Sequence, residues 1–314
     1  MFALVFPGQG SQFIGMGKDL AESFSIAKET FQEVDDALEL NLSKIMFAGE
    51  EAELNLTENT QPALMAVSVA VARILQDAKP EVFTTEKTKF IAGHSLGEYS
   101  ALTSCGTFSL SDCANLLKIR GTAMQKAVPV GIGAMAAIIG LEIEDLNEIV
   151  KAASDDKHIV GVANDNSFGQ VVISGHKEAV ERAMVLAKEK GAKRAMPLPV
   201  SAPFHCSLMQ PAAETMREAF SHVEAQAPSI PLIANITANQ VTDPAKITEL
   251  LIEQVTGQVR WRESVLYMKS QGVEKLVELG AGKVLAGLTK RIDKGLDSVS
   301  VGTPQQIEDF LKGL

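Results

Sequence analysis

A glycine-flanked serine between an apolar segment and a helix-like segment constrains the fold of this chain more than any other feature. Residues 88–102 read TKFIAGHSLGEYSAL, in which Phe90-Ile91-Ala92 reads as the end of a strand and the residues from Leu96 onward as a helix. Between them Gly93–Gly97 fits G-x-S-x-G, which forms a sharp nucleophile elbow when a strand precedes it and a helix follows. Small residues leave room where the turn is tight, and the N-terminus of the helix favours an anion. The pattern therefore predicts Ser95 as a nucleophile; the alternative is an incidental serine in a glycine-rich turn.

The segments on either side of this serine alternate between strand-like and helix-like patterns. Thr57–Leu75 is apolar nearly all round, which is typical of a buried central helix. Alternating strands and helices indicate an α/β fold with a mainly parallel sheet. The expected strands are Phe2–Phe6, Phe90–Ala92, Pro228–Ala238 and Lys275–Leu279, and the other expected helices are Ser23–Leu40, Ile247–Val255 and Val284–Ile292.

The stretch from 131 to 200 changes character and predicts a second, smaller unit. Its patterns read strand, helix, strand, strand, helix, strand, which is the βαββαβ order of ferredoxin-like domains. We therefore predict a small subdomain at 129–199, inserted into a large subdomain made of 1–128 and 200–314. The expected elements are a strand in GAMAAIIG, a helix at Ile143–Ala153, strands in HIVGVAN and QVVISG, a helix at His176–Gly191 and a strand at Lys193–Val200.

Composition excludes several classes of function. The formal net charge of −10 argues against general nucleic-acid binding. The three cysteines, Cys105, Cys113 and Cys206, form no CxxC and have no metal-ligand spacing, which favours free thiols in a reducing compartment and no metal site. No segment has the features of a signal peptide or the length of a membrane span. We therefore expect a cytoplasmic protein without a membrane or nucleic-acid partner.

Arg120 occupies an unusual position in the helix that follows the elbow helix. That helix is expected to start at a cap on Ser111 or Asp112 and to run to about Ala127. Its apolar stripe falls at i, i+3, i+4, i+7 and i+11 and includes the arginine; the members are Cys113, Leu116, Leu117, Arg120 and Met124. An isolated buried charge is too costly, so Arg120 must be paired with an acidic residue or bind an anion. The spacing favours neither alternative.

A serine nucleophile needs a base, and His205 is the best of the five histidines. It lies in the apolar, proline-stiffened stretch PVSAPFHCSLM, which leads out of the small subdomain. Cys206 is a minor alternative nucleophile. The acids between Ser95 and His205 cluster on exposed helices, so we expect a dyad in which a backbone carbonyl orients the histidine. A fixed cation near such a serine suits an acyl group that ends in a carboxylate.

Five motifs stand in the order typical of one family. They are FPGQGSQ at Phe6–Gln12, TQPAL at Thr60–Leu64, GHSLGEYSAL at Gly93–Leu102, RGTAMQ at Arg120–Gln125 and PFHCSLM at Pro203–Met209. From Phe2 to about Ile292 the chain resembles the malonyl-CoA:acyl carrier protein transacylases of type II fatty acid synthesis. It is also similar to the acyltransferase domains of polyketide synthases.

The resemblance implies an α/β-hydrolase-like large subdomain and a ferredoxin-like small one. It implies Ser95 as nucleophile, His205 as base and then acid, and Arg120 as the clamp on the malonyl carboxylate. The remaining implied contacts are the backbone N–H groups of Gln9 and Leu96 as the oxyanion hole, the main-chain carbonyl of Gln254 on His205, and substrate contacts from Gln61, Met124, Asn164 and Phe204.

The implied reaction is ping-pong transfer of malonyl from coenzyme A to the phosphopantetheine thiol of acyl carrier protein, without a cofactor, by a monomer. Phe204 resembles the bulky aromatic residue of malonyl-selective relatives and would exclude an α-methyl branch. The carrier protein is acidic, so it needs a local basic surface; the candidates are Lys188, Lys190, Lys193 and Arg194, or Lys283, Lys290, Arg291 and Lys294. A thioesterase and a non-catalytic carrier-protein scaffold are the rival functions. The sequence leaves fatty acid and polyketide synthesis open as pathways, and a free-standing chain favours the former.

Overall fold

A parallel sheet forms the centre of the large subdomain. The computed structural model describes residues 1–200 and 202–314. The strands lie in the order β10-β9-β1-β2-β7-β8, and every pair is parallel except β7 with β8. Their bounds are β1 (Phe2–Phe6), β2 (Thr88–Gly93), β7 (Leu232–Ile233), β8 (Gln240–Val241), β9 (Lys275–Leu279) and β10 (Asp297–Val301). The elbow follows β2, which lies beside the central strand β1.

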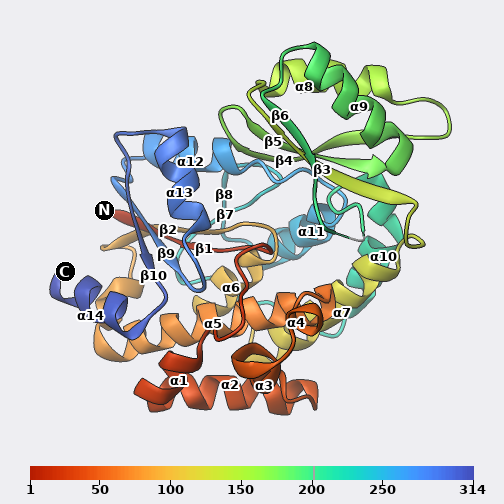
Figure 1. Ribbon diagram of the computed structural model, residues 1–314. Helices are drawn as coiled ribbons and strands as arrows, with labels where there is room; N and C mark the ends of the chain where they lie inside the picture. Colours follow the sequence, from red (N-terminus) through yellow and green to blue (C-terminus); the bar gives the residue numbers. More distant parts are fainter. Residues whose placement is uncertain (201) are drawn as a thin grey trace.

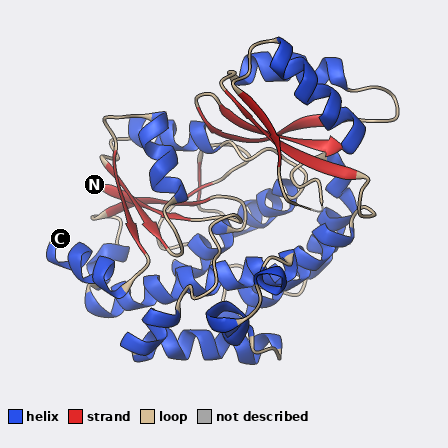
Figure 2. Cartoon of the chain, viewed as in Figure 1, coloured by secondary structure: helices blue, strands red, loops and turns tan. Residues whose placement is uncertain are grey.

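Helices cover both faces of this sheet, as expected for parallel strands that are apolar on both sides. On one face α5 (Thr57–Ala78) packs against α2 (Ser25–Leu38), α6 (Gly97–Ser104) and α7 (Leu110–Lys126). Figure 1 shows this helical layer below the sheet, and Figure 2 shows the same arrangement by secondary structure. On the other face, Trp261 and Leu288 share a core with Val5 and Phe90. The large subdomain is therefore a helix–sheet–helix sandwich, as predicted.

The remaining helices of the large subdomain connect and flank these layers. The 3₁₀ turns are η1 (Pro80–Phe83) and η2 (Ser207–Met209). The α-helices are α1 (Lys18–Ser23), α3 (Leu42–Ala48), α4 (Glu51–Leu54), α10 (Gln210–Phe220), α11 (Pro244–Gln254), α12 (Trp261–Ser270), α13 (Val284–Ile292) and α14 (Pro304–Lys312). None of the helices described is long and apolar enough to cross a membrane.

The small subdomain has an antiparallel sheet with the strand order β4-β5-β3-β6. Two helices pack against it and share a separate apolar core (Figure 1). In chain order the elements are β3 (Gly133–Ile139), α8 (Ile143–Ala153), β4 (Val160–Ser167), β5 (Gln170–His176), α9 (Lys177–Glu189) and β6 (Arg194–Pro197). The predicted βαββαβ order is confirmed, although β4 runs to Ser167 and β6 is shorter than expected. The boundaries 1–128, 129–199 and 200–314 stay a prediction.

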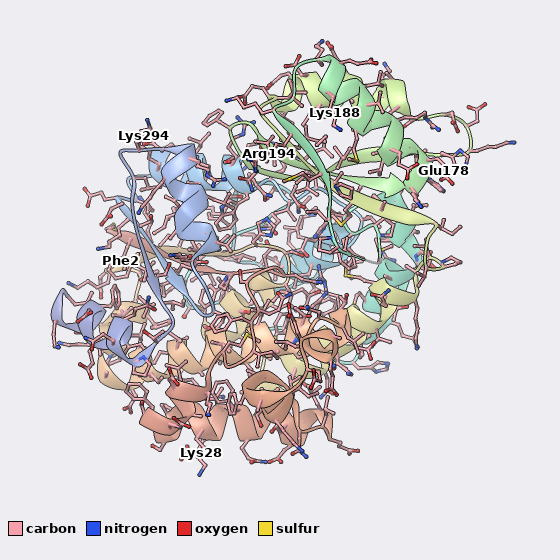
Figure 3. All side chains as sticks on the ribbon, viewed as in Figure 1. Phe2, Lys28, Glu178, Lys188, Arg194 and Lys294 are labelled. Atoms are coloured by element: carbon pink, nitrogen blue, oxygen red, sulfur yellow. The ribbon has the colours of Figure 1, made fainter. Side chains whose placement is uncertain are left out.

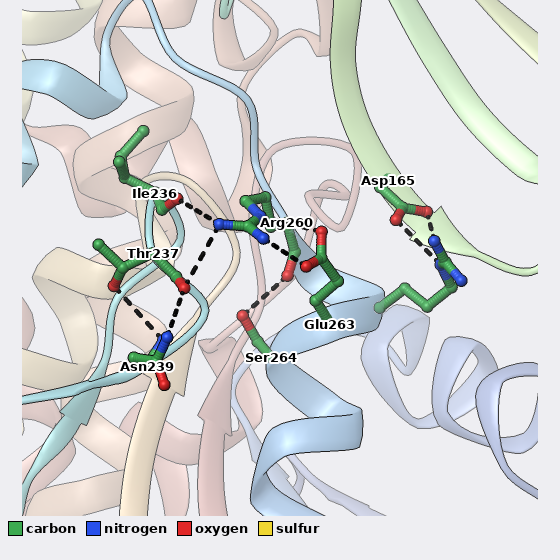
Figure 4. A network of polar contacts seen from close by, with 8 residues as sticks. Asp165, Ile236, Thr237, Asn239, Arg260, Glu263 and Ser264 are labelled. Atoms are coloured by element: carbon green, nitrogen blue, oxygen red, sulfur yellow. Dashed lines mark hydrogen bonds and ion pairs between the residues drawn. The ribbon is translucent and has the colours of Figure 1, made fainter. Parts of the chain in front are cut away.

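Strand β4 connects the small subdomain to the large one. The N–H of Asp165 donates to the carbonyl of Val259 at 2.9 Å, and the N–H of Val259 donates to Ala163 at 2.8 Å. The carboxylate of Asp165 accepts from Nε of Arg262 at 2.9 and 3.1 Å (Figure 4). The same guanidinium lies 4.7 Å from the ring centre of Phe168. These contacts fix β4 against the start of α12, next to the predicted active site.

Two local predictions were wrong. The cap of α7 is Ser109, whose Oγ accepts from the N–H of Asp112 at 3.0 Å, rather than Ser111 or Asp112. The strand expected at Pro228–Ala238 contains only Leu232–Ile233, because it lies between Pro231, which lacks an N–H, and a tight turn that ends at Ala238 with φ of 52°. That turn places Asn235 below the elbow.

Candidate active site

The elbow places Ser95 at the apex of a strained turn between β2 and α6. Its φ is 54°, a left-handed conformation that costs a non-glycine residue about 1–3 kcal/mol. A Cβ on Gly93 would lie 1.8 Å from the carbonyl carbon of Gly97, and one on Gly97 would lie 2.2 Å from the carbonyl oxygen of Phe6. Gly93 thus lets the turn close on itself, Gly97 lets it pack against β1, and the turn holds Ser95 out toward a cavity.

Asn235 holds the backbone of this turn from below. Its Oδ1 accepts from the N–H of Ser95 at 2.8 Å, and its Nδ2 donates to the carbonyl of Gly93 at 2.7 Å. The asparagine is fully buried. These two bonds satisfy backbone groups that a strained turn would otherwise leave unpaired inside the protein. Asn235 therefore contributes to the geometry of the elbow from a position 140 residues further along the chain.

His205 lies within hydrogen-bond distance of Ser95. Its Nε2 is 2.8 Å from Ser95 Oγ, and its Nδ1 is 2.9 Å from the carbonyl oxygen of Gln254 and 3.1 Å from that of Gly257. Carbonyl oxygens accept only, so Nδ1 carries the proton and Nε2 is free to accept one. Burial first, and then the positive charge of Arg120, lower the pKa of His205 to about 3. The imidazole is thus neutral at physiological pH and suited to act as a base.

The guanidinium of Arg120 lies beside the same hydroxyl and is 1% exposed. NH2 donates to Ser95 Oγ at 3.1 Å and to Gln254 Oε1 at 2.8 Å, while NH1 donates to Gln61 Oε1 at 2.8 Å. Over the described residues its Nε has no partner and the group makes no ion pair. Of the two alternatives for this buried charge, the salt bridge is therefore absent, and neutral oxygens surround a cation next to the serine.

Two residues that the sequence analysis missed complete the network around Arg120: Asn235, described above, and Glu98. Glu98 lies on α6 and is 1% exposed; its Oε1 accepts from the N–H of Asn235 at 2.6 Å, and its Oε2 accepts from Nε2 of Gln254. Burial raises the pKa of Glu98 to about 8, and the Asn235 N–H, the Gln254 amide and Arg120 oppose that rise. The signal for Glu98 was a carboxylate directly after the second elbow glycine, on an otherwise uncharged helix.

A cavity of about 110 Å³ brings together most of the other predicted site residues with Ser95, His205 and Arg120. Among the described residues, the backbone N–H groups of Gln9 and Leu96 donate to no protein acceptor. Gln254 lies outside the lining and contacts the site through Arg120 and His205. The predicted residues in the lining are Gln9, Gln61, Ser95, Leu96, Arg120, Met124, Asn164, Phe204 and His205. A larger cavity of about 870 Å³ between α13 and α14 contains none of them.

One further histidine, His94, and one cysteine, Cys206, lie near the site and are hydrogen-bonded to groups other than Ser95. His94 also lines the cavity, but its Nε2 lies 2.8 Å from Oδ1 of Asn166 on β4, whereas Nε2 of His205 is the ring nitrogen that contacts the Ser95 hydroxyl. Cys206 donates to the carbonyl of Pro203 at 3.1 Å, and burial raises the pKa of its thiol. This environment argues against Cys206 as the nucleophile. No cluster of metal-ligating side chains occurs in the described part of the chain.

Comparison with known proteins identifies the family. Residues 3–307 match the acyl transferase domain family. The chain is 46% identical over 306 residues to a malonyl CoA-acyl carrier protein transacylase of Bacillus subtilis, covering 98% of this chain and 95% of the relative. It is 54% identical to an acyl-carrier-protein S-malonyltransferase of Bartonella henselae of known structure, with a TM-score of 0.96, covering 100% of this chain and 99% of the other.

A further similar structure is a malonyl-transacylase in complex with its holo type II polyketide acyl carrier protein. It is 43% identical, with a TM-score of 0.95, and the match covers 100% of this chain and 99% of the other. The extent of these matches, together with the serine elbow and its histidine, shows that the chain belongs to the acyl transferase domain family.

Proposed function

We propose that this protein transfers a malonyl group from malonyl-CoA to the phosphopantetheine thiol of acyl carrier protein in fatty acid synthesis. The observation that carries the proposal is the position of Arg120. A buried guanidinium that pairs with no carboxylate among the described residues donates to Ser95 Oγ at 3.1 Å, in a cavity that Ser95 also lines. An acyl group on Ser95 that ends in a carboxylate supplies the missing anion.

The first half-reaction forms a malonyl ester on Ser95. Ser95 Oγ attacks the thioester carbonyl while Nε2 of His205 accepts the hydroxyl proton. The carbonyls of Gln254 and Gly257 hold the protonated Nδ1 and stabilise the imidazolium that forms. The backbone N–H groups of Gln9 and Leu96 stabilise the tetrahedral oxyanion, each by about 3 kcal/mol. As the intermediate collapses, the C–S bond breaks and coenzyme A leaves as the thiol with the proton from His205.

The second half-reaction runs the same chemistry in reverse with a different thiol. The phosphopantetheine thiol of the carrier protein gives its proton to His205 and attacks the malonyl ester. The C–O bond to Ser95 breaks, and the serine recovers the proton from His205. The products are malonyl-carrier protein and free enzyme.

Arg120 orients the acyl group in both half-reactions. A guanidinium binds a carboxylate with two parallel hydrogen bonds, which fixes the rotation of the malonyl chain. In the free enzyme NH2 donates to Ser95 Oγ, and in the acyl-enzyme the carboxylate accepts from the guanidinium instead. A fixed acyl group reacts faster with a positioned thiol than with stray water, which favours transfer over hydrolysis.

The other predicted residues shape the acyl pocket. Gln61 accepts from Arg120 at 2.8 Å, and Met124 packs against Gln61, with Sδ 3.7 Å from its Nε2. Asn164 lines the cavity from β4. Phe204 lines it next to His205 and is 8% exposed, so its ring limits the width available to an α-substituent on the acyl group. We propose that these four side chains contact the malonyl group.

The two basic clusters differ as docking surfaces for an acidic carrier protein. Lys190 lies 3.3 Å from Glu148 and 3.6 Å from Asp145, so part of the first cluster is already neutralised. Figure 3 shows Arg194 on the small subdomain and Lys294 at the top of the large one. Charge reversal at Lys294 or Arg194, followed by measurement of the KM for the carrier protein at low salt, tests which cluster docks it. The monomeric state and the cytoplasmic location stay predictions.

Intact-mass measurement of the acyl-enzyme tests the proposed function. Malonyl-CoA is expected to add one malonyl group to the protein, not to a Ser95→Ala variant, and holo acyl carrier protein is expected to remove it. Rapid loss of the adduct to water without the carrier protein would indicate a thioesterase. Failure to form the adduct would indicate a non-catalytic carrier-protein scaffold.

A further inference from the structure

Two buried ionisable side chains, Arg120 and Glu98, lie on either side of one amide next to the nucleophile. Arg120 and Glu98 are each 1% exposed, and no hydrogen bond joins them directly in the described residues. The side chain of Gln254 lies between them. Its Oε1 accepts from Arg120 at 2.8 Å, while its Nε2 donates to Glu98 and, at 3.0 Å, to the carbonyl of Ser95.

The polarity of these groups fixes the orientation of the Gln254 amide. Arginine has donors only, so it must meet the amide oxygen. The amide nitrogen then faces Glu98 and the Ser95 carbonyl, which both accept. Glu98 therefore specifies that the oxygen of Gln254, rather than its nitrogen, faces the guanidinium. Since Gln254 is fully buried, a flipped amide would place two donors against each other with no water to separate them.

The amide also separates Arg120 from the Glu98 carboxyl group by one residue. A carboxylate bound directly to Arg120 would accept from the same N–H groups that a substrate carboxylate needs. With Gln254 in between, the carboxyl group of Glu98 lies near the guanidinium, and NH2 still faces the Ser95 hydroxyl. Nε of Arg120 has no partner within the described chain, so the guanidinium keeps donor capacity that no protein acceptor uses.

We propose that Glu98 is a positioning residue for acyl specificity, which acts through the Gln254 amide to hold Arg120 ready for a substrate carboxylate. The inference rests on the proposed function. It differs from a general structural role, because a residue that only supports the elbow affects every acyl group equally. Glu98 does contact the elbow, since its Oε1 accepts from Asn235, and the test must separate the two roles.

The Glu98→Gln variant separates them. It keeps one oxygen for the Asn235 N–H but presents an NH₂ group to Nε2 of Gln254, which forces the Gln254 amide to turn. Acylation of Ser95 is then measured with malonyl-CoA and with uncharged acetyl-CoA. We expect kcat/KM for malonyl-CoA to fall about 10- to 100-fold, because one charge-assisted contact is misaligned, and the value for acetyl-CoA to change less than about 3-fold.

Glu278→Gln is the matched control. Glu278 is also 1% exposed, and its carboxyl group accepts from the N–H groups of Leu285 and Ala286 in the first turn of α13, outside the lining of the Ser95 cavity. We expect this variant to leave the malonyl-to-acetyl ratio unchanged. An equal loss for both substrates in Glu98→Gln, or no loss, would overturn the proposal. If Glu98→Gln does not fold, Glu98→Asp, which keeps the carboxyl group on a shorter side chain, is expected to lower the same ratio.

A double variant tests why the amide lies in the middle. Glu98→Gln combined with Gln254→Glu restores matched polarity between positions 98 and 254 but places a carboxylate directly on Arg120. We expect the ratio of malonyl to acetyl acylation to stay low. Recovery of malonyl transfer would overturn the role of the interposed amide. Failure of the unmodified protein to accept malonyl from malonyl-CoA would instead overturn the proposed function.

Discussion

Two arginines in this protein lie next to the junction of the subdomains and are bound in opposite ways. Nε of Arg262 donates to both carboxylate oxygens of Asp165 on β4, and its guanidinium lies 4.7 Å from the ring centre of Phe168. Arg120 is more deeply buried, and its hydrogen bonds within the described residues go to two amide oxygens and the hydroxyl of Ser95, while its guanidinium lies 5.6 Å from the ring centre of Tyr99. The first cation already has its carboxylate, whereas the second has none in the described part of the chain.

The difference separates a structural arginine from a binding arginine. A buried guanidinium without a counter-ion is costly, and a chain selected only for stability would pair it or replace it. Arg120 remains unpaired beside a nucleophile, so the cost is offset when a substrate brings the carboxylate. Burial alone does not distinguish the two arginines; the identity of the acceptors does.

Removing Arg262 is expected to have the largest effect on stability. Arg262→Ala leaves Asp165 buried without its partner, which is expected to reduce the free energy of unfolding by about 3 kcal/mol. The ratio of malonyl to acetyl transfer should not change. Chemical denaturation measures the free energy of unfolding, and the acylation rates with malonyl-CoA and acetyl-CoA give the ratio. The exposed pair of Arg182 with Asp155 is the control, since Arg182→Ala should cost less than about 1 kcal/mol. An equal loss of unfolding free energy in both variants would show that the buried pair with Asp165 contributes no more than an exposed pair.

Giving Arg120 a resident carboxylate should make it resemble Arg262. Gln61→Glu places an acidic oxygen where Gln61 Oε1 now accepts from NH1 at 2.8 Å. The new ion pair competes with the substrate carboxylate, so malonyl-CoA acylation is expected to fall about 100-fold, with little change for acetyl-CoA. Gln61→Met is the control for lost packing. Full malonyl activity in Gln61→Glu would contradict the need for an unpaired guanidinium.

The unpaired charge of Arg120 should also be visible in the titration of His205. Burial and Arg120 lower the pKa of His205 from 6.5 to about 3, so its imidazole should not titrate between pH 8 and 5. In Gln61→Glu the new carboxylate offsets the charge, and the pKa should rise; nuclear magnetic resonance of the imidazole nitrogens measures both. Between pH 6.5 and 3, His205 binds more protons in the unfolded chain than in the folded protein. The contribution of His205 therefore lowers the free energy of unfolding as the pH falls through this range. Titration of His205 near 6.5 in the unmodified protein would contradict the account.

The smallest expected effect concerns the width of the pocket rather than its charge. Phe204→Ser opens space beside His205 and is expected to raise use of methylmalonyl-CoA by about 10-fold, the low end of the range for one methyl group in an apolar pocket. Competition between malonyl-CoA and methylmalonyl-CoA measures the ratio. Absence of any gain would show that Phe204 acts only in packing.

Local patterns were sufficient for the features that depend on neighbours in the chain. The strand, glycine turn and helix around Ser95 follow from about fifteen consecutive residues, and helical spacing alone placed Arg120 on a buried face. The βαββαβ order of the small subdomain followed in the same way. Helix α12 and the terminal elements β10 and α14 were not predicted.

The partners of Arg120 depend on contacts that the chain order does not reveal. Gln61 and Gln254 are 59 and 134 residues away from it, and Asn235 reaches Ser95 across 140 residues. Whether a buried arginine meets a carboxylate or an amide is decided by how α5, α7 and α11 pack together. Spacing predicted the burial of Arg120 but not the identity of its hydrogen-bond acceptors. The role of Glu98 was not predicted, because the groups that donate to it come from two distant segments.

The most direct test of the central claim compares acylation of Ser95 in the unmodified protein and in Arg120→Ala, by intact mass on a rapid time scale. Malonyl-CoA and acetyl-CoA are used in parallel, with thermal unfolding as the check that the variant folds. We expect malonyl acylation to fall by about 100-fold or more, as for loss of a two-point charged contact, while acetyl acylation persists and is relatively favoured. Unchanged malonyl acylation, or an equal fall for both substrates, would contradict the claim that Arg120 is kept unpaired for the substrate carboxylate.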